Sequence, residues 1–529
     1  MTNTSATGTR AQEDLRQRPD RRSLYGLVFL AGIGSMATEM CASRLLAPFY
    51  GSSTVVWANI IGLILVGLSV GYILGGRLAD RHPTPRTLGL VVIAAAALIA
   101  IIPFVAQPLL RVTVRGLEQV SAGAVIGSFF GSALLFVPPV VLLGMVSPMA
   151  VRLGTTSVDQ GGRTVGGLYA LSTIGSLLGT FLPVLFFIPL IGTQRTLLGT
   201  AALIAASGAL LLGARYLGPT LVLAGLMAVP PGVVKPTEGL LYEKESLYQF
   251  VQVAAAGNAR YLYLNEGFAV HSIWRRDHVL TGGEWDMFLT TPALLDRPAA
   301  RVAILGNAGG TTARAMAVFY PDTTIDGVEI DPEVSRAGEA LLGLADNPRL
   351  NVITADARPF LMTTPTARTA VEGPYDIIMI DAYRQPYVPF YLATREFFQL
   401  VRDRLAPDGI IAMNVSTVPG DDRLARAIAG TLAAEFPQVL TWQALRYNQL
   451  VLGFKTPVAQ DELRRRLAAA PPDLLPLTEL LAATAQPAAA SVAPWTDDLC
   501  PVEWITDQMI VLYAAGGTVS GEQLLPTAP

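Results

Sequence analysis

The sequence has few charged residues, few histidines and only two cysteines. Charged side chains make up 15% of its 529 residues, whereas soluble proteins carry about 25%. Cys41 and Cys500 lie too far apart for a disulfide framework or a cysteine-ligated metal cluster. The three histidines (His82, His271 and His278) argue against a histidine-ligated metal, so we expect no metal. A net charge of −3 gives no reason to expect nucleic acid as a partner.

The shortage of charge is concentrated in the N-terminal part of the chain. Only fourteen charged side chains, and no lysine, lie between Ser23 and Val234. A membrane-spanning helix needs about 20 apolar residues, so residues 23–235 predict an all-α transmembrane domain of about seven spans in a lipid bilayer. The last run contains Pro230 and Pro231 and could instead be a re-entrant segment or an interfacial helix. The expected spans are 24–48, 54–75, 87–107, 123–147, 166–192, 194–213 and 218–234.

The ends of these spans bear on orientation. Residues 1–22 are polar and arginine-rich and lack a signal-peptide cleavage pattern, which predicts a cytoplasmic tail. Arginines after the second and fourth spans predict that those loops are cytoplasmic too. With the tail inside, seven spans would place the C-terminal half outside the cell, and six or eight would place it in the cytoplasm.

Two ionisable residues, Glu39 and Arg44, interrupt the first apolar run. Ionisable groups at membrane depth are costly and usually face a cavity or each other. Two interpretations are therefore open: a structural pair near the membrane interface, or a polar cavity that receives a substrate.

The C-terminal half has the composition of a soluble domain. Residues 236–300 contain short strand-forming runs, which predict a small β-hairpin lid. In residues 301–456 strands alternate with helices, which predicts a parallel, doubly wound α/β sheet of Rossmann type. Such a sheet binds its ligand at the carboxyl ends of the strands.

Four expected strands end in residues that suit a nucleoside. The first is followed by the turn Gly306-Asn307-Ala308-Gly309-Gly310, where glycines allow close approach of a ligand to the backbone. Glu329 stands at the spacing at which an acid binds ribose hydroxyls. Asp356 could accept from an adenine amino group, and Asp381 faces the reacting centre. A single acid at a strand end is often a helix cap, but three after a glycine-rich turn are better explained by a nucleoside site.

Residues 240–456 resemble the spermidine synthases, which are aminopropyltransferases with the S-adenosylmethionine-dependent methyltransferase fold. The chain from Ser23 to Tyr513 is similar to the membrane-fused branch of that family, except in the Ala/Pro-rich segment 457–493, which we expect to be a flexible linker. The motifs that carry the resemblance are Leu264–Gly267, His271-Ser272, Gly306–Gly310, Val328–Asp331, Asp356-Ala357, Asp381 and Thr394–Phe398, with Ser43–Leu46, Gly76–Arg81 and Leu168–Ser176 in the membrane part.

The resemblance implies a cosubstrate, either decarboxylated S-adenosylmethionine or S-adenosylmethionine itself, and a set of site residues. The residues expected to bind the cosubstrate are Gly306, Gly309, Gly310, Glu329, Asp331, Asp356, Ala357 and His271. Those expected at the reacting centre are Asp381, Tyr383 and Glu284. Those expected to bind the acceptor are Trp285, Asp286, Arg384, Asp498 and Glu503.

The sequence departs from the family on the acceptor side. Gly309 replaces an aspartate that holds the aminopropyl end, and Arg384 stands near where the family's proton-accepting aspartate should be. Something like Trp285-Asp286-Met287 replaces a Tyr-His-Glu run that helps to bind the diamine. Losing a general base costs about 10²–10⁴ in rate unless another group replaces it. Candidate replacements are Glu284, Asp286, Tyr383 and the acidic motif of the 494–515 segment, which could instead cap a final helix at 501–513.

The leading hypothesis is a membrane-anchored, spermidine synthase-like transferase that releases 5′-methylthioadenosine, in polyamine-type metabolism. Its acceptor would be a small-molecule amine or an unknown compound. Alternatives are an acceptor-independent, cyclising or lyase-like reaction, or a polyamine transporter with a nucleoside-sensing domain, for which a homodimer could complete the helical bundle. Because nucleoside cosubstrates occur in the cytoplasm, we expect the catalytic domain there, attached to the inner membrane.

Overall fold

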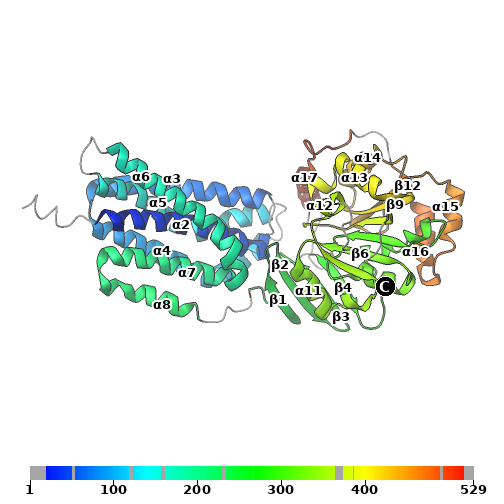
Figure 1. Ribbon diagram of the computed structural model, residues 1–529, viewed down its shortest axis with the longest axis horizontal. Helices are drawn as coiled ribbons and strands as arrows, with labels where there is room; N and C mark the ends of the chain where they lie inside the picture. The colour runs from blue at the N-terminus through cyan, green and yellow to red at the C-terminus, as the bar shows by residue number, and fades with distance from the viewer. Residues whose placement is uncertain are drawn as a thin grey trace, which may run out of the picture. The chain divides into compact units, whose positions relative to one another are not determined.

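A computed structural model describes residues 20–50, 54–117, 123–155, 161–228, 234–265, 267, 269–363, 373–384, 387–488 and 493–516. These residues form two compact units, unit 1 up to Pro236 and unit 2 from Thr237 onward. The helices and strands of both are labelled in Figure 1.

Unit 1 is a bundle of long, apolar helices. Five stretches of its described residues are long and apolar enough to cross a membrane. The fifth stretch, Gly161–Leu212, contains two helices, because the backbone leaves the helical region at Gly192, where φ is 83°. The elements are α2 (Arg21–Tyr50), α3 (Thr54–Arg81), α4 (Pro85–Leu117), α5 (Gly123–Gly154), α6 (Gly161–Leu182), the π-helix η2 (Pro183–Phe187), α7 (Ile188–Leu212), the 3-10 helix η3 (Ala214–Leu217) and α8 (Gly218–Leu226).

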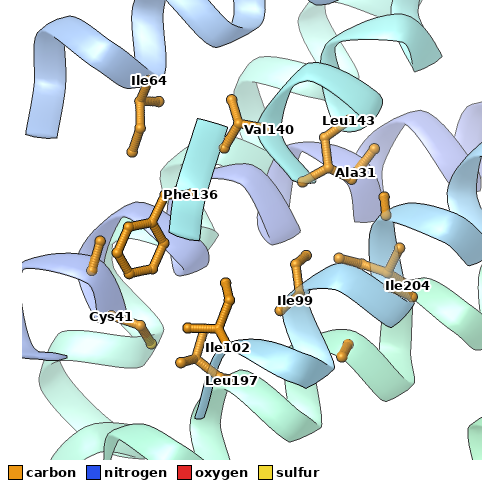
Figure 2. Packing of buried hydrophobic residues seen from close by; sticks show 14 of the residues in the cluster. Ala31, Cys41, Ile64, Ile99, Ile102, Phe136, Val140, Leu143, Leu197 and Ile204 are labelled. Atoms are coloured by element: carbon orange, nitrogen blue, oxygen red, sulfur yellow. The ribbon is translucent and has the colours of Figure 1, made fainter. Parts of the chain in front are cut away.

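The core of unit 1 lies between these helices and is filled by aliphatic and aromatic side chains. Figure 2 shows Cys41 of α2, Ile102 of α4 and Leu197 of α7 gathered in this core. Helices of a membrane bundle approach closely where small residues meet. Gly71 of α3 and Gly144 of α5 make such a contact, where a side chain on either would collide with the facing backbone.

Helices α2 to α7 run alternately in opposite directions. Gly154 at the end of α5 packs on Leu24 at the start of α2, and Gly208 near the end of α7 packs on Gly89 near the start of α4. The starts of α2, α4 and α6 and the ends of α3, α5 and α7 therefore lie at one end of the bundle.

The last part of unit 1 returns to the opposite end. Nζ of Lys235 donates a hydrogen bond of 3.1 Å to the carbonyl oxygen of Pro48, near the end of α2. The Gln107 side chain of α4 donates to the carbonyl oxygen of Val234. The chain thus passes along the bundle a seventh time after α7. Helix α8, with 9 residues, is about 14 Å long, and residues 229–233 of the expected seventh span lie outside the described residues.

Unit 2 contains two β-sheets. The smaller is antiparallel, in the order β1-β2-β3-β4, and is larger than the hairpin expected from the sequence. The larger has the order β12-β10-β11-β9-β8-β5-β6-β7. Its strands β5 to β9 are parallel, and β10 to β12 complete one side antiparallel. The strands are β1 (Leu240–Glu245), β2 (Phe250–Ala256), β3 (Ala259–Leu264), β4 (Val270–Arg275), β5 (Arg301–Leu305), β6 (Thr324–Glu329), β7 (Leu350–Thr354), β8 (Tyr375–Ile380), β9 (Leu405–Ser416), β10 (Gln438–Trp442), β11 (Asn448–Phe454) and β12 (Gln486–Pro487).

Helices cover both faces of the larger sheet. One face packs against α12, α13, α14 and α17, and the other against α9, α10, α15 and α16. The order of the strands reverses between β5 and β8, which is the point where open α/β sheets bind their ligands. The helices are α9 (Glu284–Phe288), α10 (Thr311–Phe319), α11 (Pro332–Leu341), α12 (Ala357–Met362), α13 (Arg395–Arg404), α14 (Arg423–Leu432), α15 (Gln460–Leu467), α16 (Leu475–Thr484) and α17 (Val502–Gly516).

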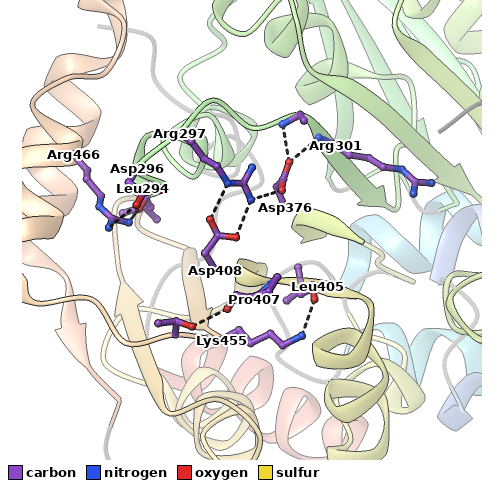
Figure 3. Close-up of polar contacts among 12 residues, drawn as sticks. Leu294, Asp296, Arg297, Arg301, Asp376, Leu405, Pro407, Asp408, Lys455 and Arg466 are labelled. Carbon is purple, nitrogen blue, oxygen red and sulfur yellow. Dashed lines mark hydrogen bonds and ion pairs between the residues drawn. The ribbon is translucent and has the colours of Figure 1, made fainter. Parts of the chain in front are cut away.

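The amino ends of the parallel strands carry a network of ion pairs. Figure 3 shows the Arg297 guanidinium between the carboxylates of Asp376 and Asp408, at 2.6 and 2.8 Å. Arg301 pairs with Asp326 at 2.8 Å, and both side chains are almost completely buried. Each of these acids has a cation beside it.

The expected flexible linker at 457–493 is wrong for most of its length. Helices α15 and α16 and strand β12 occupy residues 460–487. Leu463, Leu467, Leu474 and Leu481 are buried against the sheet, and Arg466 donates a hydrogen bond of 2.9 Å to the carbonyl oxygen of Leu294. The high content of alanine and proline obscured the helical spacing of the leucines. Residues 489–492 lie outside the described residues.

Candidate active site

The glycine-rich turn joins β5 to α10. Gly306 and Gly310 have positive φ angles of 89° and 84°, and Ala308 has a φ of 44°. A side chain on Gly306 would collide with the backbone after β8, so a glycine there lets the turn lie directly beside the end of that strand. The backbone N–H of Gly309 donates a 2.8 Å hydrogen bond to Oγ of Ser272 in the small sheet, which connects the turn to the lid.

Glu329, the last residue of β6, is bound to this turn. Its carboxylate accepts hydrogen bonds of 3.0 Å from the backbone N–H groups of Ala308 and Asp331. The side chain is 7% exposed, and burial raises its pKa to about 7 despite those hydrogen bonds. The structure thus brings Glu329 to the glycine-rich turn, as expected for the acid of a nucleoside site.

Two other expected cosubstrate-binding acids cap helices. Asp331 caps α11 by accepting from the backbone N–H of Glu333 at 2.9 Å, and Ser246 of the lid donates to its other oxygen at 2.5 Å. Burial raises the pKa of Asp331. Because its side chain is fully buried, Asp331 stabilises the fold. Asp356 caps α12, whose first residue is the buried Ala357.

Asp356 has a second partner that the sequence did not indicate. Oη of Tyr391 donates to its free oxygen at 3.0 Å, and burial with the neighbouring carboxylate raises the pKa of Tyr391 to about 12. Tyr391 lies in the 3-10 helix η6 (Phe390–Leu392), 35 residues along the chain from Asp356, so no local motif marks the pair.

The three residues expected at the reacting centre lie together. Asp381 directly follows β8, and burial raises its pKa to about 7. Glu284 begins α9, and burial together with the charge of Asp381 raises its pKa to about 8. The pKa of Tyr383 is raised by burial and by both carboxylates. Within the part of the chain that the structure describes, no cation contributes to the pKa of either acid.

Neighbouring backbone and side-chain groups fix the orientation of this cluster. Nδ2 of Asn414 in β9 donates to Asp381 at 2.9 Å. Oη of Tyr383 donates to the carbonyl oxygen of Asn414 at 2.9 Å and accepts from the N–H of Ser416 at 2.8 Å. Sequence reasoning missed Asn414, although it follows Met413, the register partner of Ile380, and so had to lie beside Asp381.

The remaining expected residues fall into several environments. Asp286 is buried and accepts four hydrogen bonds from Thr281 and Gly282, so the turn before α9 occupies its carboxylate. Trp285 is 5% exposed and belongs to the interior. Burial lowers the pKa of His271 to about 4, which keeps this imidazole neutral at physiological pH.

In the C-terminal segment, Asp497 makes side-chain hydrogen bonds to the rest of unit 2, and Asp498 is exposed. The Asp497 carboxylate receives two hydrogen bonds from Arg358 at 2.6 and 2.7 Å, and one from Thr394 at 2.7 Å. Glu503 lies in the first turn of α17, and Arg384 is exposed in the loop after β8. The segment is thereby attached to the helix that begins at Ala357, next to the expected nucleoside site.

The sheet order and the strand-end acids define the class of unit 2, a doubly wound α/β domain with these acids at the switch point of the strand order. Residues 284–443 match the spermine/spermidine synthase domain. A protein of Bifidobacterium longum called "Probable polyamine aminopropyl transferase" is 35% identical over 224 residues, which are 41% of this chain and 48% of that one. The chain therefore spans about half the length of that relative.

Two further likenesses concern Corynebacterium proteins. The "Polyamine aminopropyltransferase" of Corynebacterium efficiens is 26% identical over 445 residues, 77% of this chain and 79% of that one. The crystal structure of a probable spermidine synthase from Corynebacterium glutamicum shares 19% identity, covers 54% of this chain and 98% of that one, and has a TM-score of 0.37. The C-terminal half of the chain is thus similar to spermidine synthase-like proteins, through residues 284–443 and through these relatives.

Proposed function

We propose that unit 2 transfers an aminopropyl group from decarboxylated S-adenosylmethionine, or the corresponding group from S-adenosylmethionine, to an amine and releases 5′-methylthioadenosine. The observation that carries this proposal is the pair of cation-free carboxyls, Glu284 and Asp381, beside the glycine-rich turn that holds Glu329. The names of the relatives support the same reaction class.

The nucleoside would lie along the strand ends. Glu329 would accept hydrogen bonds from the ribose hydroxyls, and the turn Gly306–Gly310 would allow close approach of the ligand to the backbone. Both Asp331 and one oxygen of Asp356 are occupied by helix caps, so these two residues would shape the pocket more than they would bind the cosubstrate.

The acceptor side needs a positively charged amine to lose a proton. In the proposed step a proton leaves the ammonium for Glu284, the nitrogen attacks the propyl carbon, and an N–C bond forms as the C–S bond breaks. The electron pair of that bond goes to sulfur, which leaves as a neutral thioether. A base with a pKa near the working pH is best suited to this role, and Glu284, with a pKa of about 8, has one. Asp381 would attract the ammonium and orient it.

An acceptor-independent reaction is the second candidate, and Asp286 favours it. The family's diamine-binding run is replaced here, and the one carboxylate in the replacement is taken up by its own turn. A nucleophile within the cosubstrate would then attack in place of an external amine.

We also propose that unit 1 anchors the protein in the membrane, with unit 2 on the side away from the cytoplasm. Arg77, Arg81, Arg86, Arg152 and Arg163 all lie in loops or helix ends at the end of the bundle where α2 starts, and arginine-rich loops face the cytoplasm. The chain leaves unit 1 beside Pro48, at the other end. This orientation differs from the cytoplasmic placement expected from the sequence, and it requires that the nucleoside cosubstrate reach unit 2 outside the cytoplasm. A C-terminal alkaline phosphatase fusion should be active and a green fluorescent protein fusion dark, and the reverse would restore the cytoplasmic placement.

Product analysis tests the reaction. The detergent-purified protein would be incubated with each form of the cosubstrate, with and without putrescine, and the products identified by mass spectrometry. Putrescine-dependent aminopropyl product supports the transferase. Thioether nucleoside released equally without an amine supports the second candidate, and binding without product contradicts both. Asp381→Asn should bind the nucleoside and give no product.

A further inference from the structure

Glu39 of unit 1 is a buried acid that the proposed reaction does not use. It lies in the interior of α2, the 30-residue first helix, and is 7% exposed. Among the described residues its carboxylate has no hydrogen-bond or ion-pair partner. An isolated charge at this depth is costly, so a carboxylate retained there needs an explanation.

A second unpartnered polar group lies one turn away on the same face. Oγ of Ser35 is buried and has no hydrogen-bond partner among the described residues. Gly32, Ser35 and Glu39 are spaced by three and four residues, which places them on one stripe of the helix. Gly32 packs on the backbone of α6 at Ser172, so this stripe faces α6.

The structure opposite Glu39 is irregular. Gly32 packs on Ser172, Gly175 on Phe29 and Gly179 on Ile33, so α6 runs parallel to α2 with an offset of 140 to 146 residues (172 − 32, 175 − 29 and 179 − 33). For Glu39 the upper end of this range lies at residue 185, inside the π-helix η2 (Pro183–Phe187). Helix α2 also contacts η2. Such π-helical turns often occur at functional sites.

Two prolines near this level of the bundle remove backbone hydrogen-bond donors. Pro183 and Pro189 have no N–H, so the backbone carbonyls one turn earlier receive no helical hydrogen bond from them. Together with the Glu39 carboxylate and Oγ of Ser35, these carbonyls form a set of oxygens. Its natural partner is a group that only donates, and a primary ammonium offers three N–H donors and no acceptor.

We propose that Glu39 and Ser35 bind the ammonium group of an organic amine inside the helical bundle. The site is separate from the acids of unit 2 and does not depend on the reaction proposed for them. The carboxylate supplies the counter-charge and the serine and backbone oxygens complete the hydrogen bonds.

The test is equilibrium binding of radiolabelled spermidine to the full chain in lipid nanodiscs. Glu39→Gln keeps the shape of the side chain and should weaken one binding component at least about 30-fold, because a buried charge pair loses a partner. Ser35→Ala should weaken the same component about 2- to 10-fold, as expected for one hydrogen bond. Tetramethylammonium, which has no N–H, should not compete.

Asp80→Asn is the matched control, since it removes an exposed acid that pairs with Arg152 at the ends of α3 and α5 in the same unit. It should leave binding unchanged. Size-exclusion behaviour and 5′-methylthioadenosine binding verify that each variant is folded, and Ser35→Ala tests the site if Glu39→Gln does not fold. Unchanged spermidine binding in both variants, or equal competition by tetramethylammonium, overturns the proposal. Asp381→Asn separates the two units: loss of a different component supports the acceptor site of unit 2, and no loss counts only against that site.

Discussion

The two ends of the parallel strands in unit 2 use buried acids in opposite ways. At the amino ends, Asp326 and Asp376 are each paired with an arginine. At the carboxyl ends, Glu284 and Asp381 have no cation contributing to their pKa values, which burial raises to about 8 and about 7. Within the same sheet, the acids at the amino ends of the strands are paired with cations, whereas those at the carboxyl ends are not paired with any cation among the described residues.

The paired acids are therefore suited to stabilising the fold, and the unpaired acids are suited to proton transfer. A paired carboxylate is a fixed anion, whereas a desolvated, unpaired carboxyl exchanges its proton near neutral pH and can take part in proton transfer. Keeping unpaired acids buried lowers the stability of the folded state, which is the usual trade-off at functional sites. Substitutions at the two edges should therefore have different signatures.

The largest effect is expected at the unpaired edge. Glu284→Gln should lower kcat by about 10²–10⁴, because the proposed proton acceptor is lost. Nucleoside binding should be unchanged, since Glu329 and the glycine-rich turn remain. Steady-state kinetics and calorimetric titration with 5′-methylthioadenosine measure the two quantities. Glu339→Gln, an exposed position on α11, is the control, and a fully active Glu284→Gln variant would contradict the assignment.

At the paired edge, Arg301→Leu should destabilise the protein by about 3–5 kcal/mol, because it leaves Asp326 buried without its cation. The pH dependence of any residual activity should not change. Thermal unfolding followed by circular dichroism measures the loss. The double variant Arg301→Leu with Asp326→Leu should recover part of it, since the orphaned charge is gone, and equal destabilisation by both would refute the ion-pair explanation.

A pH titration sharpens the comparison further. Glu284 must be ionised to accept a proton, so kcat/KM should rise with pH up to about 8.

Stability should change in the opposite direction. The folded pKa values of Glu284 and Asp381 exceed those of unfolded carboxyls, so the native state holds extra protons between about pH 4 and pH 8, and stability falls as pH rises through that window. Asn414→Leu removes the hydrogen bond that lowers the pKa of Asp381 and should move the part of the stability loss that is due to Asp381 to higher pH.

The smallest effect is expected at a partly exposed pair. Arg358→Met should cost no more than about 1 kcal/mol, because the bond to Asp497 is half in solvent. It should nevertheless speed limited proteolysis between residues 488 and 500, since Arg358 ties that segment to α12. Arg336→Met, on the exposed face of α11, should leave the cleavage rate unchanged, and equal cleavage of both variants would show that the tie is unimportant.

Much of this arrangement could be predicted from the sequence. The long apolar runs and the alternation of strands and helices separated a membrane-type bundle from an α/β domain, because burial in lipid and burial in a sheet leave different periodicities. The glycine-rich turn and the acids after β6 and β8 were identified because parallel strands bring their carboxyl ends to one edge.

Other features depend on contacts between distant residues. Residue type alone does not show whether an acid at a strand end is buried, caps a helix or binds a ligand. Asp331 and Asp356 cap helices, and only the structure showed this. The folding of residues 460–487 onto the sheet depends on leucines meeting a surface built elsewhere in the chain.

The sequence by itself determined the division into an apolar helical part and an α/β part and which acids reach the strand ends, since both follow from local spacing. Only the tertiary structure decided which of those acids are paired with a cation and which are not. Pairing requires a second side chain from another strand, as with Arg301 and Asp326, and the pKa of a carboxyl depends on that three-dimensional neighbourhood.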